Sequence, residues 1–185
     1  MNDEQKKAFE RDKECNYGID IASAGRFRVS ALFQRNKTAM VLRRIKDTIP
    51  TIEELRIPEV IKELSMTKRG LVLFAGGTGS GNSTTLAAMV GYRNQNSSGH
   101  ILTIEDPIEF DHDHGGCVVT QREVGIDTDS YEVALKNSLR QAADVIMIGE
   151  IRTRDTMDYA ISFAETGHLC LSTIHAINAN QPLDR

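Results

Sequence analysis

The sequence has few cysteines, no long apolar segment and no excess of positive charge. Its three cysteines, Cys15, Cys117 and Cys170, are far apart and form no C-x-x-C pair. This argues against a disulfide framework and a zinc site, so reduced, cytosolic thiols are expected. No apolar segment is long enough to cross a bilayer, and the polar start MNDEQKKAFERDKE is no signal peptide. With a net charge of −4, the chain is not expected to bind nucleic acid.

What is present first is a short α+β region followed by helical sequence. In RFRVSALFQ, residues 26–34, apolar and polar residues alternate as in a half-buried strand. In TIEELRIPEVIKELSM, residues 51–66, Thr51 and Glu54 have the spacing of a capping box, and Pro58 suits the first turn of a second short helix. We therefore expect a partial α+β module at 1–50 and a helical linker at 51–66.

From Gly70 onward, short apolar segments alternate with helical ones. The predicted strands are LVLFAG, HILTIED, CVVTQ, DVIMIGE and HLCLSTIH, and the predicted helices are the segment from Ser83, SYEVALKNSLRQ and TMDYAISFAETG. Apolar strands separated by helices predict an α/β fold with an open, mainly parallel sheet. In such folds the active groups lie at the carboxyl ends of the strands.

The segment GGTGSGNSTT, residues 76–85, matches the phosphate-binding pattern G-x-x-x-x-G-K-[ST] except that Asn82 stands at the lysine position. It follows a predicted strand and precedes a predicted helix, so backbone N–H groups and the helix end can hold phosphate oxygens. A simple glycine-rich turn is the alternative. The predicted nucleotide-binding residues of the loop are Gly76, Gly77, Thr78, Gly79, Ser80, Gly81, Asn82, Ser83 and Thr84.

Acidic residues end two of the predicted strands. Glu105 and Asp106 follow the strand in TIEDPIEF, where a carboxylate can orient the attacking water or take its proton. Glu150 ends DVIMIGE, where an acid can reach a magnesium shell. Solvated carboxylates are the alternative at each position.

Histidines give weaker signals. His168 and His175 lie at the two ends of the strand HLCLSTIH, and each is compatible with a packed or solvated side chain. The segment DHDHGGC, residues 111–117, contains metal-ligand residue types, but its charge and glycines are typical of an exposed turn.

Taken together, GGTGSGNSTT, ILTIEDPIEF, TQREVG, RQAADVIMIGEIR and AETGHLCLSTIHAINANQ resemble the Walker A, Asp-box, Walker B and His-box regions of the secretion ATPases. The resemblance is to type IV pilus retraction ATPases of the PilT and PilU kind, with QREVG similar to the retraction branch. It implies a cytoplasmic hexamer, alone or with other pilus ATPase subunits, that binds ATP and Mg²⁺. It also implies peripheral attachment to the inner membrane through the pilus platform protein, and a role in pilus disassembly and twitching motility.

The resemblance also assigns roles to single residues. Glu105 resembles the catalytic glutamate of the Asp box, Glu150 the Walker B glutamate, and His175 the His-box histidine. Ser83 and Glu150 are then the expected Mg²⁺ residues. RFRVS and VLRRI are similar to amino-terminal segments whose arginines face nucleotide, which implies that Arg28 and Arg43 contact it.

By the same resemblance, residues 1–50 form part of a PAS-like domain and 67–185 a RecA-like ATPase domain that is incomplete at its carboxyl end. The chain is therefore expected to be a fragment of a retraction ATPase. It departs from the family pattern at Asn82 and at Thr153, where aspartate is usual. Asn82 leaves hydrolysis open, and the alternatives are a non-hydrolysing subunit within a hexamer of active relatives or a truncated relic.

Overall fold

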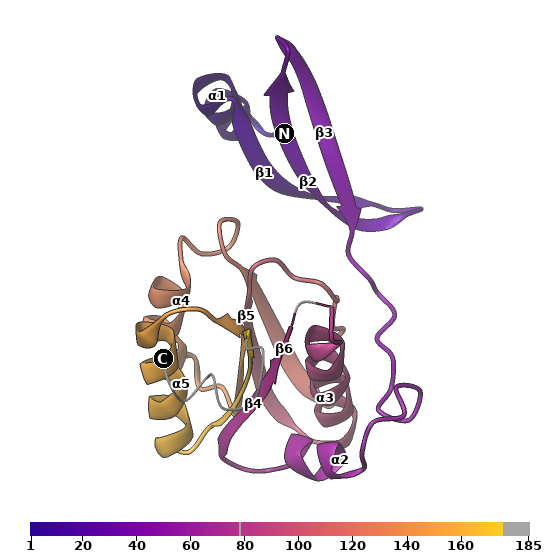
Figure 1. Ribbon diagram of the computed structural model, residues 1–185, viewed down its shortest axis with the longest axis vertical. Helices are drawn as coiled ribbons and strands as arrows, with labels where there is room; N and C mark the ends of the chain where they lie inside the picture. Colours follow the sequence, from indigo (N-terminus) through magenta and orange to yellow (C-terminus); the bar gives the residue numbers. More distant parts are fainter. Residues whose placement is uncertain (78, 176–185) are drawn as a thin grey trace. The chain divides into compact units, whose positions relative to one another are not determined.

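The computed structural model describes residues 1–77 and 79–175, without the side chain of His175. The chain has two compact units, Met1–Asp47 and Thr48–Arg185. Figure 1 shows the helices and strands of each unit. Every helix in the described ranges is too short or too polar to span a bilayer.

The amino-terminal unit is a helix packed on a three-stranded antiparallel sheet, in the order β1-β2-β3. Its elements are α1 (Asp3–Asp12), β1 (Glu14–Ile21), β2 (Gly25–Gln34) and β3 (Lys37–Arg44). The strand predicted at 26–34 is confirmed as β2. Phe9 of α1 packs against Tyr17, Val29 and Ala31, so one sheet face forms the small core of this unit.

The second unit contains a five-stranded parallel sheet in the order β4-β8-β7-β5-β6. Its elements are α2 (Val60–Ser65), β4 (Gly70–Gly76), α3 (Asn82–Asn96), β5 (Gly99–Glu105), β6 (Cys117–Glu123), α4 (Tyr131–Ser138), a 3-10 helix (Leu139–Gln141), β7 (Val145–Ile151), α5 (Arg154–Glu165) and β8 (Leu169–His175). The predicted α/β fold with a mainly parallel sheet is confirmed. All carboxyl ends of its strands lie at one edge, which places the predicted site residues there.

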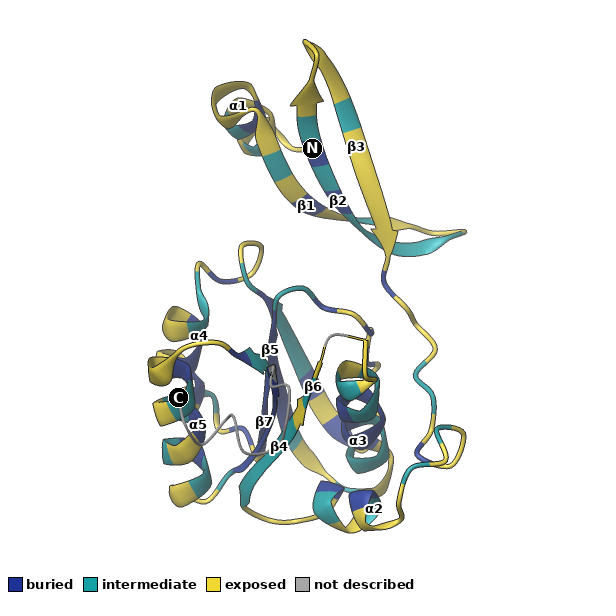
Figure 2. Ribbon diagram, viewed as in Figure 1, coloured by how far each residue is buried: buried dark blue, intermediate teal, exposed yellow. Residues whose placement is uncertain are grey.

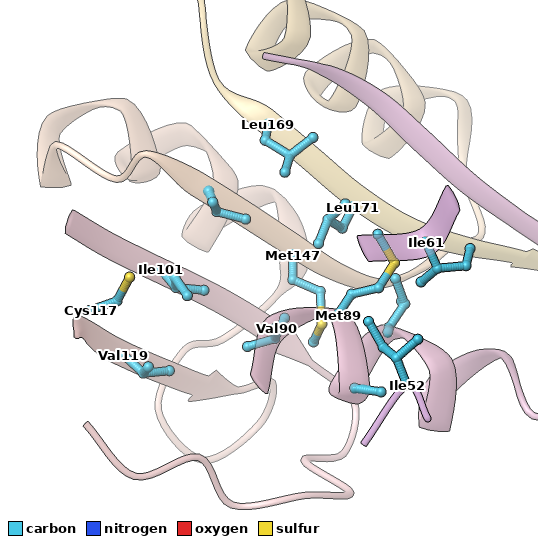
Figure 3. Close-up of a cluster of buried hydrophobic side chains, with 13 residues drawn as sticks. Ile52, Ile61, Met89, Val90, Ile101, Cys117, Val119, Met147, Leu169 and Leu171 are labelled. Carbon is cyan, nitrogen blue, oxygen red and sulfur yellow. The ribbon is translucent and has the colours of Figure 1, made fainter. Parts of the chain in front are cut away.

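Both faces of this sheet are buried. Helices α2 and α3 cover one face, and α4 and α5 cover the other (Figure 1). Successive residues of the central strands therefore pack into opposite clusters, and Figure 2 shows these strands as buried. Figure 3 shows Met89 and Val90 of α3 facing Ile101, Met147 and Leu171 of the sheet. Burial on both sides explains why the central strands β5 and β7 are mostly apolar, without the alternation of a half-exposed strand.

The segment predicted to be a helical linker is helical only in α2. The Thr51–Glu54 capping pair forms, since Thr51 N donates to Glu54 Oε2 at 2.8 Å and Glu54 N donates to Thr51 Oγ1 at 3.1 Å. It closes a turn, however, because Arg56 has a positive φ of 53° and Pro58 disfavours helix before it. Ile52 is buried in the second unit's core, which anchors the segment there.

Candidate functional site

The predicted phosphate loop connects β4 to α3. Gly79 and Gly81 have φ values of 83° and 90°, which favour glycine. Gly81 is the N-cap of the 15-residue helix α3, and no side chain caps the helix. Its first N–H groups are therefore available to an anion, and the helix dipole favours negative charge there.

Later residues of the loop also pack closely against its first residues, Gly76 and Gly77. A Cβ on Gly76 would lie only 2.8 Å from Ser80 Oγ and 3.1 Å from Asn82 Nδ2. Ser80 Oγ in turn donates to Gly77 O at 2.7 Å. A side chain at position 76 would therefore require the Ser80 side chain to move.

A cavity of about 330 Å³ opens beside this loop, at the carboxyl edge of the sheet. Among the predicted loop residues that the structure describes, all except Gly76 line it; Thr78 lies outside the described residues. The sheet side is lined by Glu105 of β5, Glu150 of β7 and Thr173 of β8. The structure therefore brings together the predicted phosphate loop and both predicted acids.

Glu105 is a buried acid with two side-chain donors. Its Oε1 accepts from Thr103 Oγ1 at 2.7 Å and from Gln121 Nε2 at 3.1 Å, and the residue is 8% exposed. Burial raises the pKa of Glu105 from 4.5 to about 7, and the two hydrogen bonds oppose this shift. A carboxyl group with such a pKa can exchange a proton with water near neutral pH.

Gln121 of β6 holds Glu105 and the loop after β5 together. Besides its bond to Glu105, its Nε2 donates to Phe110 O at 2.9 Å, and its Oε1 accepts from His112 N at 2.8 Å. Phe110 and His112 line the cavity. The sequence marks this glutamine only as part of QREVG, because its contacts join segments distant along the chain.

Glu150 is paired in this structure. Its Oε1 accepts from Arg152 Nη2, and Arg152 Nη1 lies 3.5 Å from Asp106 Oδ2. Arg152 therefore bridges carboxylates that follow β5 and end β7. Thr153, where the resemblance implies aspartate, caps α5 by accepting from Thr156 N at 3.2 Å. Capping explains why threonine is accommodated there.

The histidines differ in their surroundings. The backbone of His175 pairs in register with Gly76, at the start of the phosphate loop, but its side chain lies outside the described residues. His168 Nδ1 lies 3.2 Å from Phe163 O. His112 is buried, not exposed as the turn-like sequence of 111–117 predicts, and burial lowers its pKa to about 4. It is therefore neutral at pH 7.

Two further predictions concern metal and arginine residues. In the described part of the chain, no three His, Cys, Asp or Glu side chains are placed to hold a metal ion. A cation here would need phosphate oxygens as additional ligands, a common arrangement for Mg²⁺. Arg28 of β2 and Arg43 of β3 are register partners in the amino-terminal unit. Their contact with nucleotide stays a prediction.

Tyr131 is a site residue that the sequence does not reveal. Its side chain lines the cavity, and its hydroxyl is buried without a hydrogen-bond partner among the described residues. The hydroxyl lies 3.1 Å from the place of a Cβ on Gly149. Burial raises the pKa of Tyr131, so the hydroxyl remains a donor. A buried donor without a partner beside a cavity is available to a water or a ligand.

We expect Tyr131→Phe to stabilise the unliganded chain and to weaken ATP binding. Removing an unsatisfied buried hydroxyl should raise the free energy of unfolding by about 1 kcal/mol. Losing a neutral donor to phosphate should lower ATP affinity about fivefold. Urea unfolding and equilibrium titration measure the two effects. Tyr159→Phe on α5 is the control, and equal effects of both substitutions would contradict this role of Tyr131.

The sequence and the structure are similar to those of known proteins. The model of the Type II/IV secretion system protein family matches residues 10–185. Over all 185 residues the chain is 66% identical to the type IV pilus ATPase PilU of Pseudomonas aeruginosa and 46% identical to PilT, the type IV pilus retraction ATPase of the same species. It covers 48% and 54% of their respective lengths, so it spans about half of these relatives.

The structure is similar to the crystal structure of the pilus retraction motor PilT with bound ADP. The TM-score is 0.95 at 41% sequence identity, and the match covers 100% of this chain and 54% of that chain.

Proposed function

This chain belongs to the Type II/IV secretion system protein family, and we propose that it is the ATP-binding part of a type IV pilus retraction motor. The observation that carries the proposal is the cavity, where an uncapped helix end and a glycine loop face two acids on neighbouring strands. This arrangement suits a triphosphate at the loop and an attacking water beside the acids. The identity to PilU and PilT and the fold of ADP-bound PilT support it.

In this proposal, the loop N–H groups and the start of α3 hold the phosphates. Ser83 and Glu150 both line the cavity and would hold Mg²⁺ together with phosphate oxygens. Bound Mg²⁺ would neutralise negative charge on the phosphates. Because Glu150 is paired with Arg152, it would have to share or exchange this partner.

Glu105 is the proposed general base. It is buried, it lines the cavity, and Thr103 and Gln121 fix its orientation. Its raised pKa suits proton transfer from water. His175, at the end of β8, is proposed to be a catalytic residue. Arg28 and Arg43 of the amino-terminal unit are proposed to contact the nucleotide.

We further propose that 1–50 belongs to a PAS-like domain and 67–185 to a RecA-like domain, joined by 51–66. The working assembly is a hexamer, with itself or with related pilus ATPases. It acts in the cytoplasm at the inner-membrane pilus platform and drives pilus disassembly and twitching motility. The identity to PilU over the whole chain supports this role.

The test has a binding arm and a cellular arm. Titration of the chain with ATP in excess Mg²⁺ should give saturable binding. In Pseudomonas aeruginosa, the matching half of PilU is replaced by this chain with and without Asn82→Lys, and twitching is measured. A chimera that accumulates normally and supports no twitching in either form would refute the motor role. Absence of ATP binding by the folded chain would refute the nucleotide site itself.

A further inference from the structure

We propose that Asn82 makes ATP binding at this cavity conditional on a divalent cation. This inference rests on the proposed nucleotide site and concerns how the site is regulated. A site with a loop lysine has a fixed cation for the β- and γ-phosphates. Here the described residues that line the cavity offer no such charge, so Mg²⁺ bound to the nucleotide has to provide it beside the loop.

The charges around the cavity carry the inference. Among its described lining residues, none is a lysine or an arginine, and His112 is neutral near pH 7. Four residues bear carboxyl groups: Glu105, Asp106, Glu109 and Glu150. ATP without a metal is strongly negative, and the described lining residues would meet it with these acids and with neutral donors such as backbone N–H groups, the Asn82 amide and the Tyr131 hydroxyl. Binding in that form is electrostatically opposed.

Arg152, which contacts two of these acids, does not change this balance. Arg152 pairs with Glu150 and approaches Asp106, and its position between two carboxylates offsets them rather than adding positive potential at the loop. Asn82 itself lies close to the loop base, with Nδ2 3.1 Å from the place of a Cβ on Gly76. Its amide is neutral, so it can donate a hydrogen bond but cannot offset phosphate charge.

A loop lysine and Mg²⁺ should therefore each reduce the gain in ATP affinity that the other provides. Both are positive and both approach the β- and γ-phosphates, so each reduces the benefit that the other provides. Where the lysine is replaced by a neutral side chain, Mg²⁺ has no competing charge and should improve ATP affinity more. By linkage, ATP should also increase Mg²⁺ affinity more strongly in this chain than in its lysine variant.

The experiment measures ATP affinity in excess Mg²⁺ and in excess EDTA, for the chain and for Asn82→Lys. Removing Mg²⁺ should weaken ATP binding about 100-fold in the chain and about tenfold in Asn82→Lys, a difference within the usual range of coupling between sites. Asn82→Gln, which is longer but neutral, is the matched control and should behave as the parent chain does.

A second variant tests the proposal independently if Asn82→Lys folds poorly. Glu109 is exposed and lines the cavity, so Glu109→Gln removes one carboxylate with little effect on packing. It should reduce the Mg²⁺ dependence of ATP binding about twofold to fivefold. Equal or smaller Mg²⁺ dependence in the parent chain than in Asn82→Lys overturns the proposal, as does an unchanged dependence in Glu109→Gln. If ATP binds in neither condition, the nucleotide site fails as well.

Discussion

Replacing Asn82 with lysine is expected to raise ATP hydrolysis about 100-fold to 1000-fold, the usual value of a well-placed donor at a developing charge. Lysine carries a full charge on a four-carbon stem that reaches the β- and γ-phosphates. The asparagine amide is neutral and lies closer to the backbone, so it cannot reach the same oxygens. Backbone N–H groups at the start of α3 are unchanged, so part of the ground-state affinity should persist in the parent chain.

The expected gain in ATP affinity is smaller, about 1.5–3 kcal/mol for one charge-assisted hydrogen bond. Hydrolysis is measured in the PilU chimera, with Asn82→Gln as the neutral control. Similar rates for the parent and Asn82→Lys forms would mean that another cation serves the phosphates. Arg28 and Arg43 of the amino-terminal unit are then the candidates, and their replacement with glutamine would have to abolish the remaining hydrolysis.

Glu105→Gln, made in the Asn82→Lys form of the same chimera, is expected to lower turnover about 100-fold to 10,000-fold. Nucleotide affinity should stay nearly unchanged, because a base acts mainly in the transition state. With a pKa of about 7, Glu105 must lose its proton to act, so turnover in the Asn82→Lys form should rise as the pH passes through about 7 and then level off. Unchanged turnover in Glu105→Gln would remove Glu105 from this role.

The same substitution should change the pH dependence of stability. The folded chain holds the Glu105 proton more tightly than the unfolded chain, because burial raises the pKa from 4.5 to about 7. This acid therefore lowers the free energy of unfolding as the pH rises through that range. Glu105→Gln should be more stable than the parent chain above pH 7, by on the order of 3 kcal/mol, with little difference below about pH 4. Urea unfolding of the chain across this range measures it, and Glu165→Gln at the end of α5 is the exposed control.

The sequence predicts those parts of the candidate site whose residues are contiguous along the chain. A strand, a glycine loop and a helix are contiguous, so the loop before α3 could be predicted from residues 76–85. Glu105 and Glu150 could be placed because parallel strands share a carboxyl edge. Tyr131 and Gln121 could not, since their roles depend on contacts across the sheet that no local pattern encodes.

Helix α4 shows a second limit. Val133 of α4 and Leu139 of the 3-10 helix that follows it, two apolar residues of the predicted segment, are 45% and 48% exposed. The face toward the sheet instead uses Ala134, Leu135 and Ser138. Only Leu135 of these is large, so a pattern based on large apolar residues identifies only part of that face.

The place of β8 in the sheet has a consequence for how the site forms during synthesis. β8 lies between β4 and β7 and pairs Gly70 with Leu169. The strand that leads into the phosphate loop therefore gains its parallel partner only after almost the entire second unit has left the ribosome. Such distant pairing slows folding. Nucleotide binding should thus require synthesis through β8, with no competent site on nascent forms that end before it.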